Sequence, residues 1–282
     1  MNFNMKKIFG FTEIIRPINF LITLISILVA GIICNSNSFD FAKIIFAAIA
    51  GAFVGSAGNV INDYFDIEID LINKPNRPLP AGKITKREAL IFYLFLNVMA
   101  IILAMKINII AITIVVISIV SIFFYSFHLK KIPLIGNLVV SFFTGLAFVF
   151  GGAAVNGVGN SIFPAFFAFL INLIREIVKD MEDVEGDLKL GVITFPAKYG
   201  FKKAMNLILV ITIILILSTM IPFFTKYYSI EYFIVVILGV NVLLVYFLKS
   251  IFTNREKNSL SKLSNLLKLI MVIGLIAIYL GS

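Results

Sequence analysis

Residues 41–70 read FAKIIFAAIAGAFVGSAGNVINDYFDIEID, a long apolar run that passes directly into a run rich in aspartate. An apolar run of this length is typical of a helix that crosses the ~30 Å hydrocarbon core of a membrane. If the helix continues into the polar run, Asp63, Asp66 and Asp70 stand at i, i+3 and i+7 and share one face. Asn62 then lies beside Asp66 on that face. This stretch therefore predicts a membrane helix that ends in a row of carboxylates.

A second row of carboxylates, formed by Asp180, Asp183 and Asp187, has the same spacing. Ten of the 15 acidic residues of the chain lie in or next to these two rows. Like charges on one helix face repel each other unless a cation neutralises them. Both rows therefore indicate a bound divalent cation, and scattered acids at a solvated helix end are the alternative.

The available ligand types favour magnesium over zinc. Carboxylate oxygens are hard ligands that suit Mg²⁺, which keeps coordination positions for phosphate oxygens. The chain has one cysteine, Cys34, and one histidine, His128, so it cannot form an internal disulfide or a zinc site built from several of these residues. We therefore expect Mg²⁺ as the cofactor.

The composition indicates a membrane protein with several transmembrane helices. The 282 residues are 60% hydrophobic and only 14% charged, and the mean hydropathy is +1.05. Segments long enough to span the membrane are expected at 14–34, 41–66, 88–105, 108–127, 135–156, 161–183, 204–222, 230–250 and 263–281. The sequence thus predicts an all-α integral membrane protein with nine transmembrane helices.

The basic residues predict the orientation of these helices. With nine helices, Lys43, Lys106 and Lys226 lie on one side of the membrane, and the rest of the 24 lysines and arginines lie on the other side. The side rich in basic residues is the cytoplasmic one. We therefore expect a cytoplasmic N-terminus, an outer C-terminus, and two carboxylate rows that both face the cytoplasm.

A basic, proline-rich loop follows the first row. Residues 73–82 read NKPNRPLPAG, and three prolines stiffen the chain around Lys74 and Arg77. A guanidinium held in this way can make bidentate contacts to phosphate. Lys130 and Lys131 add charge in another loop on the same side, although attraction to anionic lipid is the alternative for a single lysine. Carboxylates, Mg²⁺ and these cations together match the needs of a diphosphate leaving group.

The chain combines the two carboxylate rows with nine apolar segments and with the pair Arg16-Pro17 at the start of the first segment. With this combination, nearly the whole chain resembles the UbiA superfamily of intramembrane prenyltransferases. The resemblance implies a single UbiA-like domain over residues 1–282, with nine helices around a central cavity that opens to the cytoplasm and laterally to lipid. It also implies a multi-pass protein of the cell membrane.

The resemblance further implies roles for individual residues. Binding of Mg²⁺ and diphosphate falls on Asn62, Asp63, Asp66, Asp70, Asp180, Asp183 and Asp187. Together with Lys74 of the basic loop, the expected substrate contacts are Arg16, Asn62, Arg77, Ser126, Lys130 and Lys131. The expected catalytic residues are Asp66, Asp70, Asp183, Asp187 and Tyr125, the last at the cavity wall near the allylic carbon. The implied reaction is Mg²⁺-assisted loss of pyrophosphate and attack by an acceptor oxygen.

The sequence from Arg175 to Asp187, followed by Gly191, Thr194 and Pro196, bears on the acceptor. It is similar to the branch of the superfamily that forms the second ether bond of archaeal-type membrane lipids. That branch transfers a geranylgeranyl group from geranylgeranyl diphosphate to geranylgeranylglyceryl phosphate. Related sequences also occur in branches that prenylate quinone precursors, so an aromatic acceptor is the alternative.

A divalent-cation transporter is the alternative from another class, since paired acidic helices in membranes also mark ion pathways. Both rows, however, end helices on one membrane face, whereas a transporter needs a site near the midplane with access from both sides. We expect the partners to be a prenyl diphosphate, a phosphorylated lipid-like acceptor and membrane lipids, and we expect neither nucleic acid nor an obligate protein partner.

Overall fold

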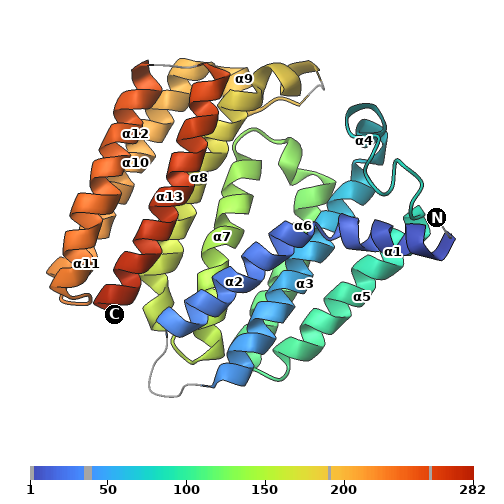
Figure 1. The fold of residues 1–282 in the computed structure, drawn as a ribbon, viewed down its shortest axis with the longest axis horizontal. Coiled ribbons are helices and arrows are strands. Elements are labelled where there is room, and N and C mark those ends of the chain that lie inside the picture. Colours follow the sequence, from blue (N-terminus) through green and yellow to red (C-terminus); the bar gives the residue numbers. More distant parts are fainter. Residues whose placement is uncertain (1–2, 35–39, 190–191, 254–255) are drawn as a thin grey trace. The chain divides into compact units, whose positions relative to one another are not determined.

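The computed structural model describes residues 3–34, 40–189, 192–253 and 256–282, and every regular element in them is a helix (Figure 1). Eight helical segments among these residues are long and apolar enough to span a membrane. They are α3 (Phe41–Phe65), α5 (Lys86–Ala104), α6 (Ile109–Phe127), α7 (Ile135–Ala154), α8 (Val158–Lys189), α10 (Phe201–Phe224), the run Ile230–Thr253 and α13 (Lys257–Gly281). The prediction of an all-α, multi-pass membrane protein is therefore confirmed.

The first predicted span, residues 14–34, corresponds to α2 (Pro17–Ile33), but a further helix, α1 (Phe3–Ile14), precedes it and meets it at an angle of 46°. The physical reason lies at the joint, where Arg16 has a left-handed backbone (φ 54°) and Pro17 begins the next helix without an N–H to donate. A count of nine spans requires that this bent pair be taken as one.

The chain forms two compact units, and each is described by itself. The first comprises residues 1–129 and 147–161, with α3 packed against α2, α5 and α6. Small residues allow this close packing: a Cβ added at Gly51 would overlap Ile27 of α2, and one added at Gly151 would lie 2.7 Å from the Cβ of Ala30. The antiparallel packing of α2 on α3 brings the start of α2 to the end of α3, where the first carboxylate row lies.

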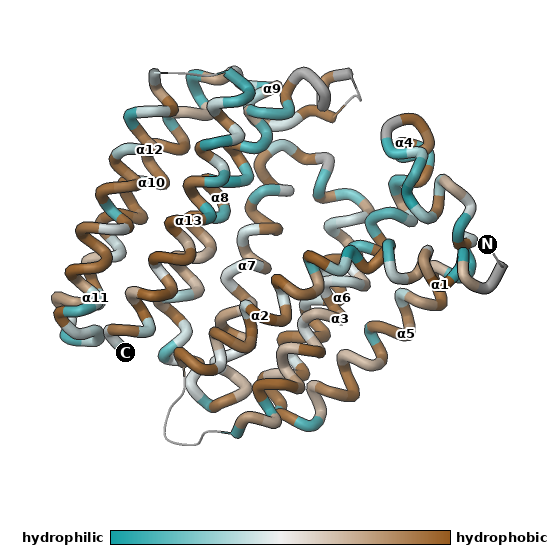
Figure 2. Tube along the Cα trace, viewed as in Figure 1, coloured by the Kyte–Doolittle hydropathy of each residue, from teal (hydrophilic) through white to brown (hydrophobic). Residues whose placement is uncertain are grey.

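The second unit comprises residues 130–146 and 162–282. Its eighth predicted span consists of α11 (Ile230–Val235), the π-helical η2 (Val236–Asn241) and α12 (Val242–Thr253), and α13 packs along all three. The middle of α10 and of α12 is hydrophobic, whereas hydrophilic residues gather where α8 ends and the short α9 (Phe195–Tyr199) lies (Figure 2). This polar end of the second unit carries the second carboxylate row.

Candidate active site

The first carboxylate row lies across a joint between two helices. Helix α3 ends at Phe65, Asp66 has φ −94° and ψ 6°, and the short α4 (Ile67–Asn73) follows. Hydrogen bonds continue through the joint, because the Asp66 N–H donates to the Asn62 carbonyl (3.0 Å) and the Asp70 N–H donates to the Asp66 carbonyl (2.8 Å). The row is therefore kept on helical backbone, although the helix does not run straight through it as the sequence analysis assumed.

Two arginines pair with two of these carboxylates. Asp63 and Asp70 are 2% and 4% exposed. The Nη1 of Arg77 donates to Asp63 Oδ1 (3.1 Å) and to Asp70 Oδ2 (2.5 Å), and the Nη2 of Arg16 donates to Asp63 Oδ1 (2.7 Å). A positive group between buried carboxylates offsets their mutual repulsion. The protein's own guanidinium groups thus supply part of the counter-charge that we had assigned to a metal ion.

Local structure explains why these arginines meet the carboxylates. Arg16 stands at the α1–α2 joint, which is tied to α3 because the Asn59 amide donates to the Ile15 carbonyl (3.2 Å). Arg77 is held within a tight loop, where its N–H donates to the Lys74 carbonyl and its own carbonyl accepts from the Ala81 N–H, both at 2.9 Å. The side chain of Lys74 is exposed. Of the cations predicted here, the structure brings the two arginines to the row and leaves the lysine in solvent.

The remaining members of the first row differ in burial. Asn62 and Asp66 are half-buried at the end of α3, and Glu68 is exposed. The exposure of Glu68 agrees with the spacing of the row, because this residue falls off the face that the three aspartates share.

An aromatic cluster lies at the adjoining end of α6. The ring of Phe65 on α3 lies 5.7 Å from that of Phe123 and 5.5 Å from that of Phe127, between ring centroids. Tyr125 is half-buried on the same turn of α6. Its neighbour Ser126 is 1% exposed, and the Ser126 Oγ is buried with no hydrogen-bond partner. Tyr125 and Ser126, the two residues predicted at a cavity wall, therefore lie buried or half-buried at this end of α6, and Ser126 holds an unsatisfied hydroxyl.

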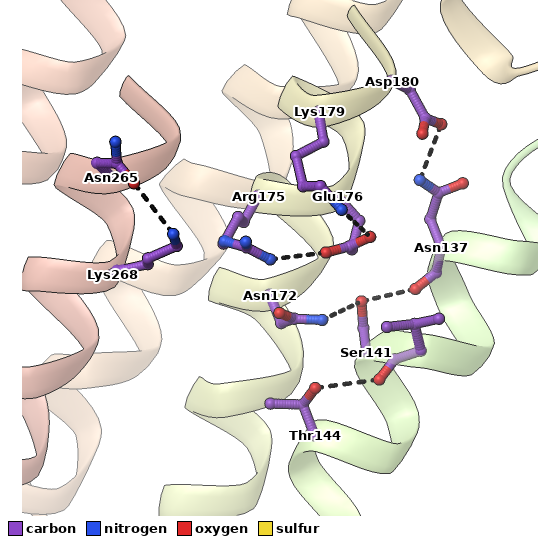
Figure 3. Close-up of polar contacts among 11 residues, drawn as sticks. Asn137, Ser141, Thr144, Asn172, Arg175, Glu176, Lys179, Asp180, Asn265 and Lys268 are labelled. Carbon is purple, nitrogen blue, oxygen red and sulfur yellow. Dashed lines mark hydrogen bonds and ion pairs between the residues drawn. The ribbon is translucent and has the colours of Figure 1, made fainter. Parts of the chain in front are cut away.

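The second row lies on an unbroken helix, because α8 continues past the predicted end at residue 183 to Lys189. Asp180 Oδ2 accepts a hydrogen bond from the Asn137 Nδ2 on α7 (2.9 Å; Figure 3), and Asp183 is exposed. Lys130 is half-buried in the short 3₁₀ helix η1 (Leu129–Lys131). Lys131 and Asp187 were also predicted as site residues, but their side chains lie outside the part of the chain that the structure describes.

Two features of α7 and α8 were missed by the sequence analysis. Glu176 pairs with Arg175 (2.8 Å) and with Lys179 (3.6 Å) one turn before the second row. Asn137, the partner of Asp180, could have been noticed, because a polar side chain near the start of an apolar membrane helix needs a hydrogen-bonding partner.

The first row fits Mg²⁺ chemically. Among the described residues, no three carboxylate, cysteine or histidine side chains are close enough to hold an ion by themselves. Mg²⁺, however, commonly takes one or two carboxylates and completes its shell with water and phosphate oxygens. The row offers oxygen ligands, and the position of Arg77 Nη1 shows that one positive group can contact Asp63 and Asp70 together.

Comparison with known proteins agrees with this chemistry. The sequence profile of the UbiA prenyltransferase family matches residues 23–271. The digeranylgeranylglyceryl phosphate synthase of Methanosphaera stadtmanae is 37% identical over 272 residues, which cover 96% of this chain and 98% of the relative. The enzyme of the same name from Methanocaldococcus jannaschii is 37% identical and covers 99% of this chain and 98% of the relative.

Solved structures show the same relationship. A structure of digeranylgeranylglyceryl phosphate synthase has a TM-score of 0.88 at 37% identity and covers 98% of both chains. A UbiA homologue from Archaeoglobus fulgidus bound to DMAPP and Mg²⁺ has a TM-score of 0.70 at 20% identity, covering 95% of this chain and 99% of that one, which is a likeness of fold. The chain therefore belongs to the UbiA prenyltransferase family.

Proposed function

We propose that this protein transfers a geranylgeranyl group from geranylgeranyl diphosphate to geranylgeranylglyceryl phosphate, in an Mg²⁺-dependent reaction that releases pyrophosphate and forms an ether bond. The observation that carries the proposal is the cluster of Arg16, Asp63, Arg77 and Asp70. It combines buried carboxylates for a divalent cation with two guanidinium groups for phosphate oxygens. Relatives named for this reaction, 37% identical over nearly the whole chain, support the choice of acceptor.

In the proposed reaction Mg²⁺ would be held at the first row by Asn62, Asp63, Asp66 and Asp70, and at the second row by Asp180, Asp183 and Asp187. Bound Mg²⁺ would neutralise charge on the diphosphate and so make it a better leaving group. Arg16 and Arg77 exchange carboxylate oxygens for phosphate oxygens and stabilise the charge that develops as the allylic C–O bond breaks. Lys74, Lys130 and Lys131 supply further positive charge for the phosphate groups of donor and acceptor.

Two residues at the end of α6 have a separate role. An electron-rich ring such as that of the half-buried Tyr125 would stabilise positive charge on the allylic carbon, and apolar surroundings would keep water from it. The buried hydroxyl of Ser126 is available to orient a substrate oxygen. We assign these residues to the part of the site that receives the first carbons of the prenyl chain.

We further propose that residues 1–282 act as one prenyltransferase domain with nine spans, a cytoplasmic N-terminus, an outer C-terminus and an active site that faces the cytoplasm. The distribution of basic residues supports this orientation. It gives water-soluble Mg²⁺ access to both carboxylate rows, and lipid-soluble substrates reach the site from the membrane.

The proposal is tested by incubating purified protein with Mg²⁺, labelled geranylgeranyl diphosphate and one of three acceptors, followed by identification of the product by mass. The acceptors are geranylgeranylglyceryl phosphate, the same ether without phosphate, and an aromatic hydroxy acid. We expect product from the first and little from the others. Efficient prenylation of the aromatic acid alone would overturn the acceptor, and no product with any acceptor would favour a different class such as the cation transporter.

A further inference from the structure

We propose that Asn137 is a positioning residue for Asp180, and that its side-chain amide holds this carboxylate in the orientation in which it binds a divalent cation. The inference rests on the proposed function, which places Asp180 among the metal ligands. It adds a residue outside both acidic rows, on a different helix, to the machinery of the site.

The contact itself has the properties that this role requires. The Asn137 Nδ2 donates to Asp180 Oδ2 at 2.9 Å, so the hydrogen bond fixes one carboxylate oxygen (Figure 3). An amide donor is neutral, and it therefore orients the carboxylate without cancelling its negative charge. A lysine or arginine in the same place would orient the group equally well but would compete with a metal ion for it. Asn137 thus holds one oxygen of Asp180 without bringing a positive charge of its own.

The turn of α7 that carries Asn137 is tied to α8 through Ser141. The Ser141 Oγ donates to the backbone carbonyl of Asn137 on the same helix (2.6 Å) and accepts from the Asn172 Nδ2 on α8 (3.4 Å). Ser141 is 0% exposed, so this contact is closed to solvent. Further along, a Cβ added at Gly145 would come within 2.6 Å of the Ala165 carbonyl oxygen, which shows how closely the two backbones approach.

These contacts have a mechanical consequence. Polar side chains between membrane helices fix the rotation of one helix on the other, because each lost partner leaves a polar group in an apolar setting. Rotation of α7 would break the contact of Ser141 with Asn172 and would swing Asn137 away from Asp180. The first turn of α7 is therefore fixed against the part of α8 that carries the second row, and Asn137 transmits this order to the carboxylate.

The size of the effect follows from other metal sites. Partners that orient a metal ligand without touching the metal usually change metal affinity by about 10–100-fold when they are removed. For Asn137→Ala we expect Mn²⁺, used as a spectroscopic substitute for Mg²⁺, to bind about tenfold more weakly. The Mg²⁺ concentration for half-maximal activity should rise by a similar factor, while kcat at saturating Mg²⁺ changes less.

The test measures Mn²⁺ binding to the full-length protein in detergent by electron paramagnetic resonance, independently of turnover. Asn137→Gln keeps an amide donor and should recover part of the affinity lost in Asn137→Ala. Asn108→Ala is the matched control: it also removes an interhelical asparagine bond, from Asn108 Nδ2 to the Ala153 carbonyl (2.7 Å), but no carboxylate is involved. This control should lower thermal stability and leave Mn²⁺ affinity unchanged.

A double-mutant cycle with Asp180→Ala separates the positioning role of Asn137 from the ligand role of Asp180. If Asp180→Ala weakens Mn²⁺ binding and Asn137→Ala adds less than a twofold effect in that background, the positioning role is supported. The inference is overturned, and the proposed function stands, if Asp180→Ala weakens Mn²⁺ binding but Asn137→Ala alone does not. The same holds if Asn108→Ala weakens Mn²⁺ binding as much as Asn137→Ala does. If Asp180→Ala itself has no effect on Mn²⁺, the assignment of Asp180 as a ligand fails first. Should Asn137→Ala not fold, Asn137→Leu takes its place, because leucine has a similar size and no amide donor. Weaker Mn²⁺ binding by Asn137→Leu than by Asn137→Gln would support the role, and equal binding by the two variants would overturn it.

Discussion

Replacing Arg77 by alanine should destabilise the metal-free protein and, at the same time, increase the stabilisation that Mg²⁺ provides. Arg77 Nη1 contacts Asp63 at 3.1 Å and Asp70 at 2.5 Å, and both carboxylates are buried. Removing one partner of a buried ion pair costs about 3–5 kcal/mol, because the other charge is left uncompensated. Asp63 keeps its contact with Arg16 at 2.7 Å, so the loss falls mainly on Asp70. We therefore expect a fall in the free energy of unfolding at the lower limit, about 3 kcal/mol.

The effect of Mg²⁺ follows from competition for the same oxygens. In the native protein a cation that bridges Asp63 and Asp70 at the position of Arg77 Nη1 must displace the guanidinium, whereas in Arg77→Ala this position is open and Asp70 has lost its positive partner. A ligand at 100 times its Kd stabilises the folded state by about 2.7 kcal/mol, so saturating Mg²⁺ should recover most of the stability lost in the variant. The native protein should gain less at the same Mg²⁺ concentration.

Thermal unfolding in detergent, in EDTA and in Mg²⁺, measures both effects. Lys74→Ala serves as the control, because Lys74 lies in the same loop with an exposed side chain. Arg77→Lys should recover part of the stability in EDTA, since it keeps the charge but loses the planar fork. The reasoning is refuted if Arg77→Ala is as stable as the native protein in EDTA, or if Mg²⁺ raises the Tm of both proteins by the same amount.

Three further predictions concern turnover, acceptor binding and topology. Asp66→Asn should lower turnover by about a hundredfold, which is ~2.7 kcal/mol of transition-state stabilisation. Glu68→Gln is the control, because Glu68 lies off the shared face, and it should change turnover little. Equal losses in the two variants, measured by steady-state kinetics, would contradict the assignment of the row. Lys130→Ala should raise the KM for the phosphorylated acceptor more than the KM for the prenyl diphosphate, because the acceptor brings an additional phosphate; an equal change in both constants would argue against this role. In a cysteine-free background, Asn76→Cys should react with an impermeant thiol reagent from the cytoplasmic side and Gly159→Cys from the outside, and cytoplasmic labelling at the second position would overturn the nine-span topology. Gly159 suits this test because the residue is exposed and an added Cβ would meet no atom within 4 Å.

The sequence alone determined where the membrane helices lie. In lipid, backbone groups must be satisfied within the segment, so a long apolar run is compelled to be helical, and this property can be counted along the chain. The expected range 41–66 became α3 (Phe41–Phe65), and 108–127 became α6 (Ile109–Phe127). The spacing of the aspartates likewise predicted the two carboxylate rows, because residue type and helical period are both local properties.

The tertiary structure decided which charges meet. Arg16 and Asp63 lie 47 positions apart and are brought to 2.7 Å because α2 packs antiparallel on α3, and Asn137 reaches Asp180 across 43 positions because α7 packs on α8. The sequence marked Arg16 and Arg77 as cations for phosphate, but it could not show that they first neutralise Asp63 and Asp70. Hydrophobicity and helical period follow from neighbouring residues, whereas the partner of a buried charge depends on helix packing and on the path of a loop, and these are fixed only when the whole chain is folded.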